Sequence, residues 1–361
     1  MKYDPIYYSD YLRLDKLLEA QEPVSEKHNR PAHDETLFII IHQAYELWFK
    51  QILHEVDSVH KLFGNARMDP RDLSVIVHRL NRVTEIQRIL NDQINVMETM
   101  GPLDFMEFRD YLVPASGFQS IQFRMIELKL GLRQEFRLQM AKEFFNSRLK
   151  EEDKNKMNKL EEETTLLELI DTWLTRMPFG KSANYNFWEQ YKQAVDEMLN
   201  QDRKIIESNR TLHPKQVEME LKNLDATKET FEILFDETRY NKLKDEGKVR
   251  ISREAKLSAI FIRLYAEEPI LQLPNNLLDC LIGIDELFTT WRYRHAIMVH
   301  RMLGTKIGTG GSSGHDYLKK STERNRVFTD FFDMATYLIP REHMPKLPDD
   351  ERQKLGFVYG D

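Results

Sequence analysis

WRYRHAIMVHRMLGTKIGTGGSSG, residues 291–314, joins the end of an expected helix to a glycine-rich loop. His295 follows Trp291 by four residues, so both side chains belong to the apolar stripe of that helix. Gly304 marks the expected C-terminal end of the helix. Residues 308–314 hold four of the chain's 14 glycines. The stretch therefore predicts a buried imidazole close to a loop whose backbone N–H groups and hydroxyls can bind an anion.

Helical periodicity dominates the rest of the chain. The strongest helix is predicted over residues 36–63, with Asp34 as its N-cap and His42 in its middle, one turn after Phe38. We find no convincing strand and no internal repeat, so the predicted fold class is all-α. Further helices are expected over residues 11–21, 71–98, 104–112, 118–131, 165–177, 252–266, 277–303 and 322–338.

The density of apolar residues along the chain indicates how it divides into domains. Residues 188–251 are predicted to form long polar helices with sparse apolar positions, which is typical of a smaller satellite helical lobe. Residues 1–187 and 252–361 are predicted to form the large helical domain. The tyrosine-rich start, with Tyr8 and Tyr11 among four tyrosines in nine positions, is either a simple amphipathic helix or a segment that docks on its own body or on another subunit.

Composition and charge exclude several classes of protein. The net charge is −7 at pH 7, so neither a nucleic acid nor an anionic membrane is an expected partner. The sequence contains no run of 18 apolar residues and no signal-peptide pattern. The single cysteine, Cys280, cannot form an internal disulfide, and a reducing compartment is the natural expectation.

Two of the 11 histidines, His42 and His295, lie in the middle of a helix among apolar residues. Each of them alone is ordinarily a hydrogen-bonded core residue, whereas the two together favour a site. The segment HEVDSVH at residues 54–60 lacks the spacing of a zinc protease, and no di-iron motif is present. A single axial histidine in an aromatic, methionine-rich setting instead fits a haem.

The glycine loop and Arg109 each leave an alternative open. The loop lacks the P-loop pattern and follows no strand, so it is either a connector or a loop that orders around a carboxylate. Arg109 can bind a carboxylate with both arms of its guanidinium, or it is a surface arginine paired with Glu107 or Asp110.

With these residues in place, the chain closely resembles the tryptophan 2,3-dioxygenase family. The resemblance covers nearly the whole chain and is weakest over residues 145–165 and 190–250. Four blocks carry it, namely HDETLFIIIHQAYELWFKQILHEVDSV (33–59), DFMEFRDYLVPASGFQSIQFR (104–124), TLLELIDTWLTR (165–176) and the opening stretch at 291–314.

The resemblance implies an activity, a cofactor and an assembly. The family is cytosolic and haem-dependent, and it inserts both atoms of O₂ across the indole C2–C3 bond of L-tryptophan to give N-formylkynurenine, the first step of the kynurenine pathway. We therefore expect one haem b per subunit, Fe²⁺ in the active form, O₂ as co-substrate and a homotetramer.

The resemblance also implies roles for individual residues. His295 is expected to be the axial ligand of the haem iron, and His42 to bind the indole N–H. Phe38 and Phe105 are expected to form the indole pocket, where many relatives have tyrosine at the second position. Arg109 is expected to bind the substrate carboxylate, Thr309 to contact the amino-acid end of tryptophan, and Ser116 to lie on the distal side of the haem. Tyr8, Tyr11 and Leu12 are expected to close the pocket of a neighbouring subunit.

Two other functions remain as alternatives. One is a helical nucleotide-binding enzyme that uses the loop Gly308–Gly314, and the other is a non-catalytic helical scaffold whose histidines are core residues.

Overall fold

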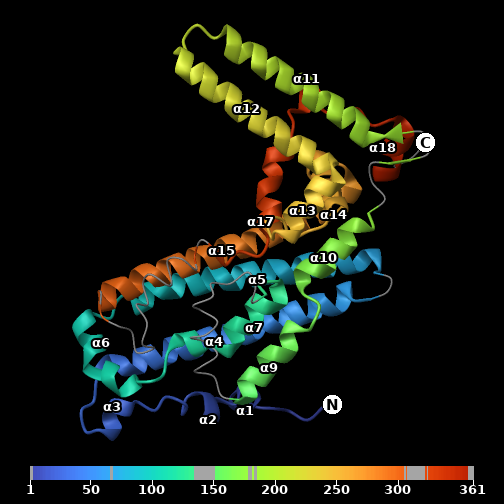
Figure 1. Cartoon of the computed structure of the whole chain (residues 1–361). Helices are drawn as coiled ribbons and strands as arrows, with labels where there is room; N and C mark the ends of the chain where they lie inside the picture. The colour runs from blue at the N-terminus through green and yellow to red at the C-terminus, as the bar shows by residue number, and fades with distance from the viewer. Residues whose placement is uncertain are drawn as a thin grey trace. The chain divides into compact units, whose positions relative to one another are not determined.

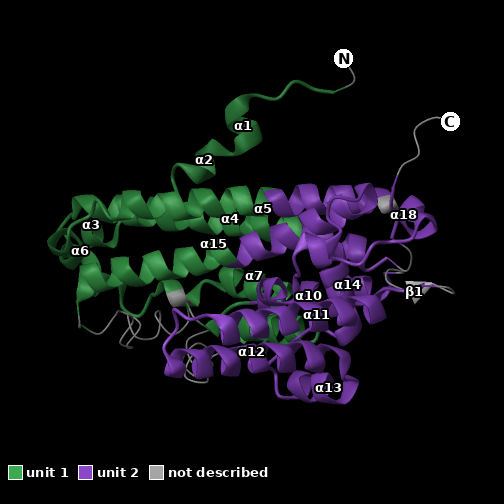
Figure 2. Cartoon of the chain, turned by 90° about the horizontal axis from the view of Figure 1, so that it is seen from above, with its two compact units in different colours: residues 1–56, 82–163, 286–326 green, residues 57–81, 164–285, 327–361 purple. Residues whose placement is uncertain are grey.

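The computed structural model describes residues 3–65, 68–133, 151–177, 181–182, 185–304, 306, 322 and 324–356. Most of these residues are helical and almost none lie in strands (Figure 1), which confirms the predicted all-α class. The chain forms two compact units, coloured separately in Figure 2. Unit 1 comprises residues 1–56, 82–163 and 286–326, and unit 2 comprises residues 57–81, 164–285 and 327–361.

Three long helices organise unit 1, and each also contributes residues to unit 2. They are α4 (His33–Phe63), α5 (Pro70–Met97) and α15 (Gln272–Leu303). The remaining elements of unit 1 are α1 (Tyr8–Leu12), α2 (Leu14–Leu17), α3 (Val24–Lys27), α6 (Pro102–Phe108), the 3₁₀ helices η1 (Arg109–Leu112) and η2 (Gly117–Gln119), α7 (Ile121–Leu130) and α9 (Glu151–Glu161).

The sequence of α4 explains why it forms a long buried helix. Acidic Asp34 and Glu35 lie in its first turn and basic His60 and Lys61 in its last, which favours both ends of the helix dipole. Its inner face, spaced at helical period, includes the buried residues Ile41, Tyr45, Phe49, Ile52 and Val56. Each fully buried apolar side chain of this size stabilises the fold by about 1.5–3 kcal/mol.

Polar side chains fix α4, α5 and α15 to one another within unit 1. The Tyr45 hydroxyl on α4 donates to the carbonyl oxygen of Leu90 on α5 at 2.9 Å. Asn91 on α5 donates to the carbonyl of Leu287 on α15 at 3.1 Å, and Arg294 on α15 donates to the carbonyl of Asn91 at 2.6 Å. The register of the three helices is therefore specified by hydrogen bonds as well as by apolar packing.

Unit 2 consists mainly of helices. Its elements are α10 (Leu166–Thr175), α11 (Phe187–Ser208), α12 (Pro214–Phe235), α13 (Glu237–Asp245), α14 (Arg253–Leu264), η4 (Pro269–Leu271), α17 (Thr329–Phe332), η5 (Asp333–Tyr337), η6 (Arg341–His343) and α18 (Asp349–Leu355), together with the two-residue strands β1 (Lys181–Ser182) and β2 (Tyr185–Asn186). The pair of strands is antiparallel and lies in a sequence in which no strand is predicted. The residues predicted as a satellite lobe fall mostly on α11, α12 and α13. The proposed boundaries of that lobe, at residues 188 and 251, stay a prediction.

Two predicted helices differ in the structure. The helix expected over residues 11–21 is broken at Arg13, whose φ of 51° lies in the left-handed region, and α1 and α2 lie on either side of it. The helix expected over residues 322–338 is interrupted, because residues 322 and 324 are helical, residues 325–328 are not, and α17 and η5 follow. The Asp285 carboxylate accepts hydrogen bonds from the backbone N–H groups of Val327 and Phe328, at 2.9 and 2.6 Å, and holds that segment outside a helix.

Candidate functional site

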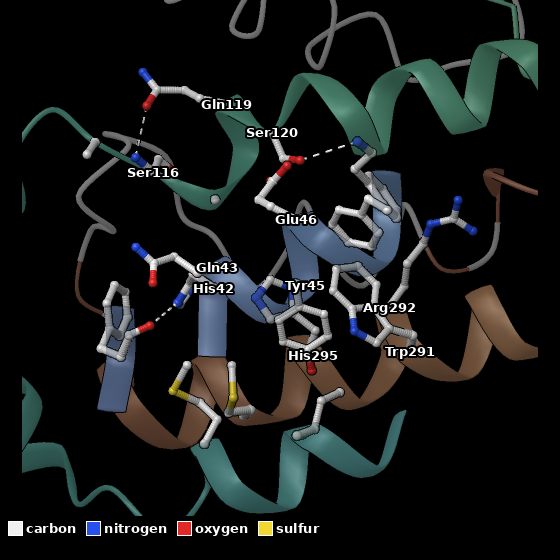
Figure 3. Close-up of a pocket in the computed structure, with 18 of the residues that line it drawn as sticks. His42, Gln43, Tyr45, Glu46, Ser116, Gln119, Ser120, Trp291, Arg292 and His295 are labelled. Carbon is white, nitrogen blue, oxygen red and sulfur yellow. Dashed lines mark hydrogen bonds between the residues drawn. The ribbon is translucent and has the colours of Figure 1, made fainter. Parts of the chain in front are cut away.

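Unit 1 contains a cavity of about 550 Å³. Figure 3 shows that α4 and α15 bring side chains to it from two directions, and the segment from α6 to α7 forms a further wall. A cavity of this size and apolar character is typical of a site for a small molecule or a cofactor. It is lined by residues of these elements that include Phe38, His42, Tyr45, Glu46, Phe105, Leu112, Ser116, Phe123, Arg124, Glu127, Trp291, Arg292, His295 and Asn325.

His42 lies on α4 and is held in one tautomer. Its Nδ1 is 2.7 Å from the carbonyl oxygen of Phe38, and because a carbonyl can only accept, Nδ1 carries the proton. Burial lowers the pKa of His42, although the hydrogen bond to Phe38 and the nearby Glu46 carboxylate oppose this effect. The imidazole is therefore neutral at pH 7, and its Nε2 is a hydrogen-bond acceptor.

His295 lies on α15 and also lines the cavity. Burial lowers the pKa of its imidazole to about 4, and the nearby His42 adds to this effect. Its ring stacks on that of Trp291, with centroids 5.2 Å apart and planes 17° apart. Its Nδ1 is buried and has no hydrogen-bond partner among the described residues. His295 is thus a neutral imidazole of fixed orientation, and its Nδ1 makes no hydrogen bond to the described residues.

Aromatic side chains form the apolar surface around the two histidines. The Phe38 ring lies 5.7 Å from Phe105 and 5.5 Å from the fully buried Phe108. Near His295, the Trp291 ring lies 5.1 Å from Phe123 and 5.9 Å from Tyr45. These edge-on and tilted pairs are the arrangements that aromatic rings prefer, and they surround the cavity with flat apolar surfaces.

A buried charged network forms another part of the wall. Glu127 on α7 accepts a hydrogen bond from Arg124 at 2.7 Å and from Arg292 of α15 at 2.8 Å. Arg292 also donates to the carbonyl oxygen of Asn325 at 2.7 Å. A buried charge is costly unless it is paired, so the ion pair between Glu127 and Arg292 holds α7 against α15.

Sequence reasoning did not find this network. The signal was present as charged residues on otherwise apolar helices, with Glu127 in IELKL and Arg292 directly after Trp291. Such residues are usually assigned to a solvent-facing side, and only the packed structure shows that Arg124, Glu127 and Arg292 are all buried.

The structure brings some of the predicted site residues together. Phe38, His42, Phe105, Ser116 and His295 all line the cavity. Arg109 is not among the described lining residues; it begins η1, its side chain is 20% exposed, and Asp110 lies 3.8 Å away. Asp110 itself is 90% exposed, so this ion pair is weakly stabilising.

The other predicted residues are outside this group. The N-terminal residues lie on α1 and are exposed to solvent, Tyr8 by 74%, Tyr11 by 72% and Leu12 by 41%. Thr309 and the loop of residues 308–314 lie outside the described residues. Gly304, before that loop, has a φ of 58° and directly follows the last residue of α15, as predicted for the end of this helix.

The donor set at the cavity fits a haem better than a metal ion held by protein ligands alone. No group of three or more His, Cys, Asp or Glu residues suited to a metal ion is found in the described part of the chain. The neutral imidazole of His295, which has an unpartnered ring nitrogen in an aromatic cavity, is the kind of ligand that a haem iron takes. None of the described helices is both long and apolar enough to cross a membrane.

Fold and site together define an all-α protein with an aromatic cavity that is lined by two neutral histidines. The model of the family described as tryptophan 2,3-dioxygenase matches residues 3–338 of the chain. The chain belongs to this family, and the resemblance found in the sequence is confirmed.

Individual relatives match over nearly their full length. The tryptophan 2,3-dioxygenase of Alteromonas mediterranea is 53% identical over 354 residues, which cover 98% of each chain. That of Bdellovibrio bacteriovorus is 45% identical and covers 99% of this chain and 100% of its own. The tryptophan 2,3-dioxygenase of Dictyostelium discoideum is 46% identical, covering 98% of this chain and 89% of its own.

Proposed function

We propose that this protein is a dioxygenase that inserts both atoms of O₂ across the indole C2–C3 bond of L-tryptophan to give N-formylkynurenine. The family and its named relatives support this oxidation. The observation that carries the proposal is the pairing of His42 and His295, two neutral imidazoles on different helices, in one aromatic cavity. The comparisons support neither a nucleotide-binding enzyme nor a non-catalytic scaffold.

Haem b, one per subunit, is the cofactor of this proposal, and His295 would ligate its iron. When bound as Fe²⁺, the haem would bind O₂ and activate it. The chain contributes the rest: Trp291 holds the plane of the His295 ring, and aromatic side chains keep water out of the cavity. Ser116, which lines the cavity, is assigned to the distal side of the haem.

His42 orients the substrate by accepting a hydrogen bond from the indole N–H at Nε2. The protonated Nδ1 on the carbonyl of Phe38 leaves Nε2 as the acceptor. Full removal of the indole proton is a different matter, because a gap of ~10 pKa units between indole and imidazolium would cost ~14 kcal/mol. His42 therefore acts by hydrogen bonding and not as a base that ionises the substrate.

The remaining residues recognise the rest of L-tryptophan. Phe38 and Phe105, whose rings lie 5.7 Å apart, are assigned to the faces of the indole. Arg109 binds the carboxylate with a charge-assisted, two-armed contact. Thr309 is assigned to the amino-acid end of the substrate by its place in the matching block of sequence.

The active assembly in this proposal is a cytoplasmic homotetramer. In it, Tyr8, Tyr11 and Leu12 of one subunit close the pocket of a neighbour, which accounts for their exposure in the single chain. Other large apolar residues are exposed on the long helices, namely Ile40 and Leu47 on α4 and Ile89 and Val96 on α5. Exposed apolar residues grouped in this way favour subunit contact.

The reaction is tested directly by isotope labelling. The haem-loaded, dithionite-reduced protein is given L-tryptophan under ¹⁸O₂, and the product is examined by mass spectrometry. The proposal expects N-formylkynurenine that carries two labelled oxygen atoms. A product with one labelled atom, or no product from a protein that holds haem, would refute it.

A further inference from the structure

The 3₁₀ helix η1 has two faces with different surroundings. A 3₁₀ helix has three residues per turn, so the side chains of Arg109 and Leu112 lie above one another on one face. Leu112 lines the cavity. Arg109 therefore shares the face of Leu112, next to the cavity but not among its described lining residues, and Tyr111 belongs to another face.

Tyr111 stacks on a histidine that belongs to a distant part of the sequence. Its ring and that of His28 have centroids 4.6 Å apart and are tilted by only 7°. His28 follows α3 directly and is exposed, and α3 packs against η1. Both Figure 1 and Figure 2 show α3 beside α6, the helix that leads into η1.

The short helix α3 is itself fixed to the start of α4. Glu35, in the first turn of α4, is fully buried, and its carboxylate accepts hydrogen bonds from the backbone N–H groups of Val24 at 2.8 Å and Ser25 at 2.9 Å. The Ser25 hydroxyl accepts from the N–H of Ala32 at 3.0 Å. The His28 ring is thus carried by a segment that is locked to the helix bearing Phe38 and His42.

We propose that the His28–Tyr111 stack is a positioning pair that holds Arg109 in place for the carboxylate of L-tryptophan. This role rests on the proposed function. The stack links η1 to α3, and hydrogen bonds link α3 to α4. The position of the Arg109 guanidinium is therefore fixed relative to the proposed indole site on α4. Without the stack, the four-residue η1 would keep its contacts with α3 and α6 and the poor hydrogen-bond geometry of a 3₁₀ helix, and Arg109 would be held less firmly before the substrate binds.

The test compares His28→Ala with His28→Phe, which keeps an aromatic ring, and with His33→Ala, an exposed histidine close by, as the matched control. His28 is a surface residue, so each variant is expected to fold. For each haem-loaded variant, KM for L-tryptophan, kcat and the Kd from calorimetry are measured. We expect His28→Ala to raise KM and Kd about two- to tenfold at unchanged kcat and haem content, and His28→Phe to restore both constants.

A double-mutant cycle adds a readout that a merely structural role would not move. In an Arg109→Ala background, His28→Ala should have no further effect on the Kd for L-tryptophan, because the clamp it positions is gone. Full additivity of the two substitutions, an unchanged KM in His28→Ala, or failure of His28→Phe to restore it would each overturn the role. A wild-type protein that does not bind L-tryptophan would refute the proposed function itself, a result separate from any variant.

Discussion

His42 donates its Nδ1 proton to the carbonyl oxygen of Phe38, four residues earlier on α4, across 2.7 Å, and the two rings lie 4.1 Å apart. The contact fixes both the tautomer and the direction of the imidazole. Phe38, which is proposed to form one face of the indole pocket, therefore also orients His42, which is proposed to bind the indole N–H. Substrate orientation is thus set by a single turn of one buried helix.

Removal of the His42 imidazole should weaken substrate binding without abolishing turnover. We expect His42→Ala to raise the Kd for L-tryptophan about two- to tenfold, the value of one neutral hydrogen bond. 1-Methyl-L-tryptophan, which lacks the indole N–H, should bind equally to both proteins. Loss of all turnover with L-tryptophan affinity and haem content intact would contradict the orienting role.

Arg109→Ala should affect only ligands that carry a carboxylate. A hydrogen bond to a charged group contributes about 1.5–3 kcal/mol, so we expect L-tryptophan to bind about 10- to 150-fold more weakly. Tryptamine, which lacks the carboxylate, should bind with nearly unchanged affinity in the same calorimetric titration. An equal loss for both ligands would show that Arg109 supports the fold of the site and is not the clamp.

The pKa of His295 gives the haem-free protein a defined dependence on pH. Its folded value of about 4 lies below the ~6.5 of an unfolded histidine. Between these values the unfolded chain binds more protons, so stability is full above pH 6.5 and is lost as the pH falls towards 4. In urea unfolding, the free energy of unfolding of the wild type should fall by about 2 kcal/mol more than that of His295→Leu between pH 7 and pH 5. Parallel losses in the two proteins would rule out this assignment.

The N-terminal tyrosines should matter for the substrate but not for the stability of the single chain. Because Tyr8 and Tyr11 are largely exposed, Tyr8→Ser/Tyr11→Ser should change the free energy of unfolding of the dissociated chain by less than about 0.5 kcal/mol. In the assembled protein the same change should weaken L-tryptophan binding. Tyr3→Ser, at another exposed tyrosine, serves as the control.

Mixed assemblies identify which subunit's tyrosines close a pocket. Co-expression of the double tyrosine variant with His295→Ala, which keeps its tyrosines but lacks the proposed iron ligand, should restore part of the L-tryptophan affinity of the intact pockets. No restoration would mean that each N-terminal segment serves its own chain.

The long helices were predictable because each carries its own periodic pattern. α4, α5 and α15 all fall close to the expected ranges, and His42 and His295 could be selected as the mid-helix histidines. The sequence pattern predicts the start of α4 three residues late, because it favours Asp34 as the N-cap. The helix begins at His33, and the Glu35 carboxylate accepts a hydrogen bond from the N–H of Val24 on α3.

The rest of the site depends on contacts between residues far apart in the sequence. The pairing of Glu127 with Arg292 spans 165 positions, and no local pattern distinguishes such a buried pair from two surface charges. The hydrogen bond from the Val327 N–H to the Asp285 carboxylate spans 42 positions, and this contact likewise overrides the local helical propensity. The roles of individual residues came from the family resemblance, and the cavity supplies the physical reason for several of them.

The most direct test of the account is the absorption spectrum of the protein during titration with hemin, followed by dithionite and L-tryptophan. We predict that the wild type takes up one hemin per chain with a Soret band that shifts on addition of L-tryptophan. His300→Ala, on the exposed side of the same helix, should behave identically, whereas His295→Ala should bind hemin weakly or lose the band. A wild-type protein that stays colourless, or a His295→Ala variant with an unchanged spectrum, would contradict the central claim.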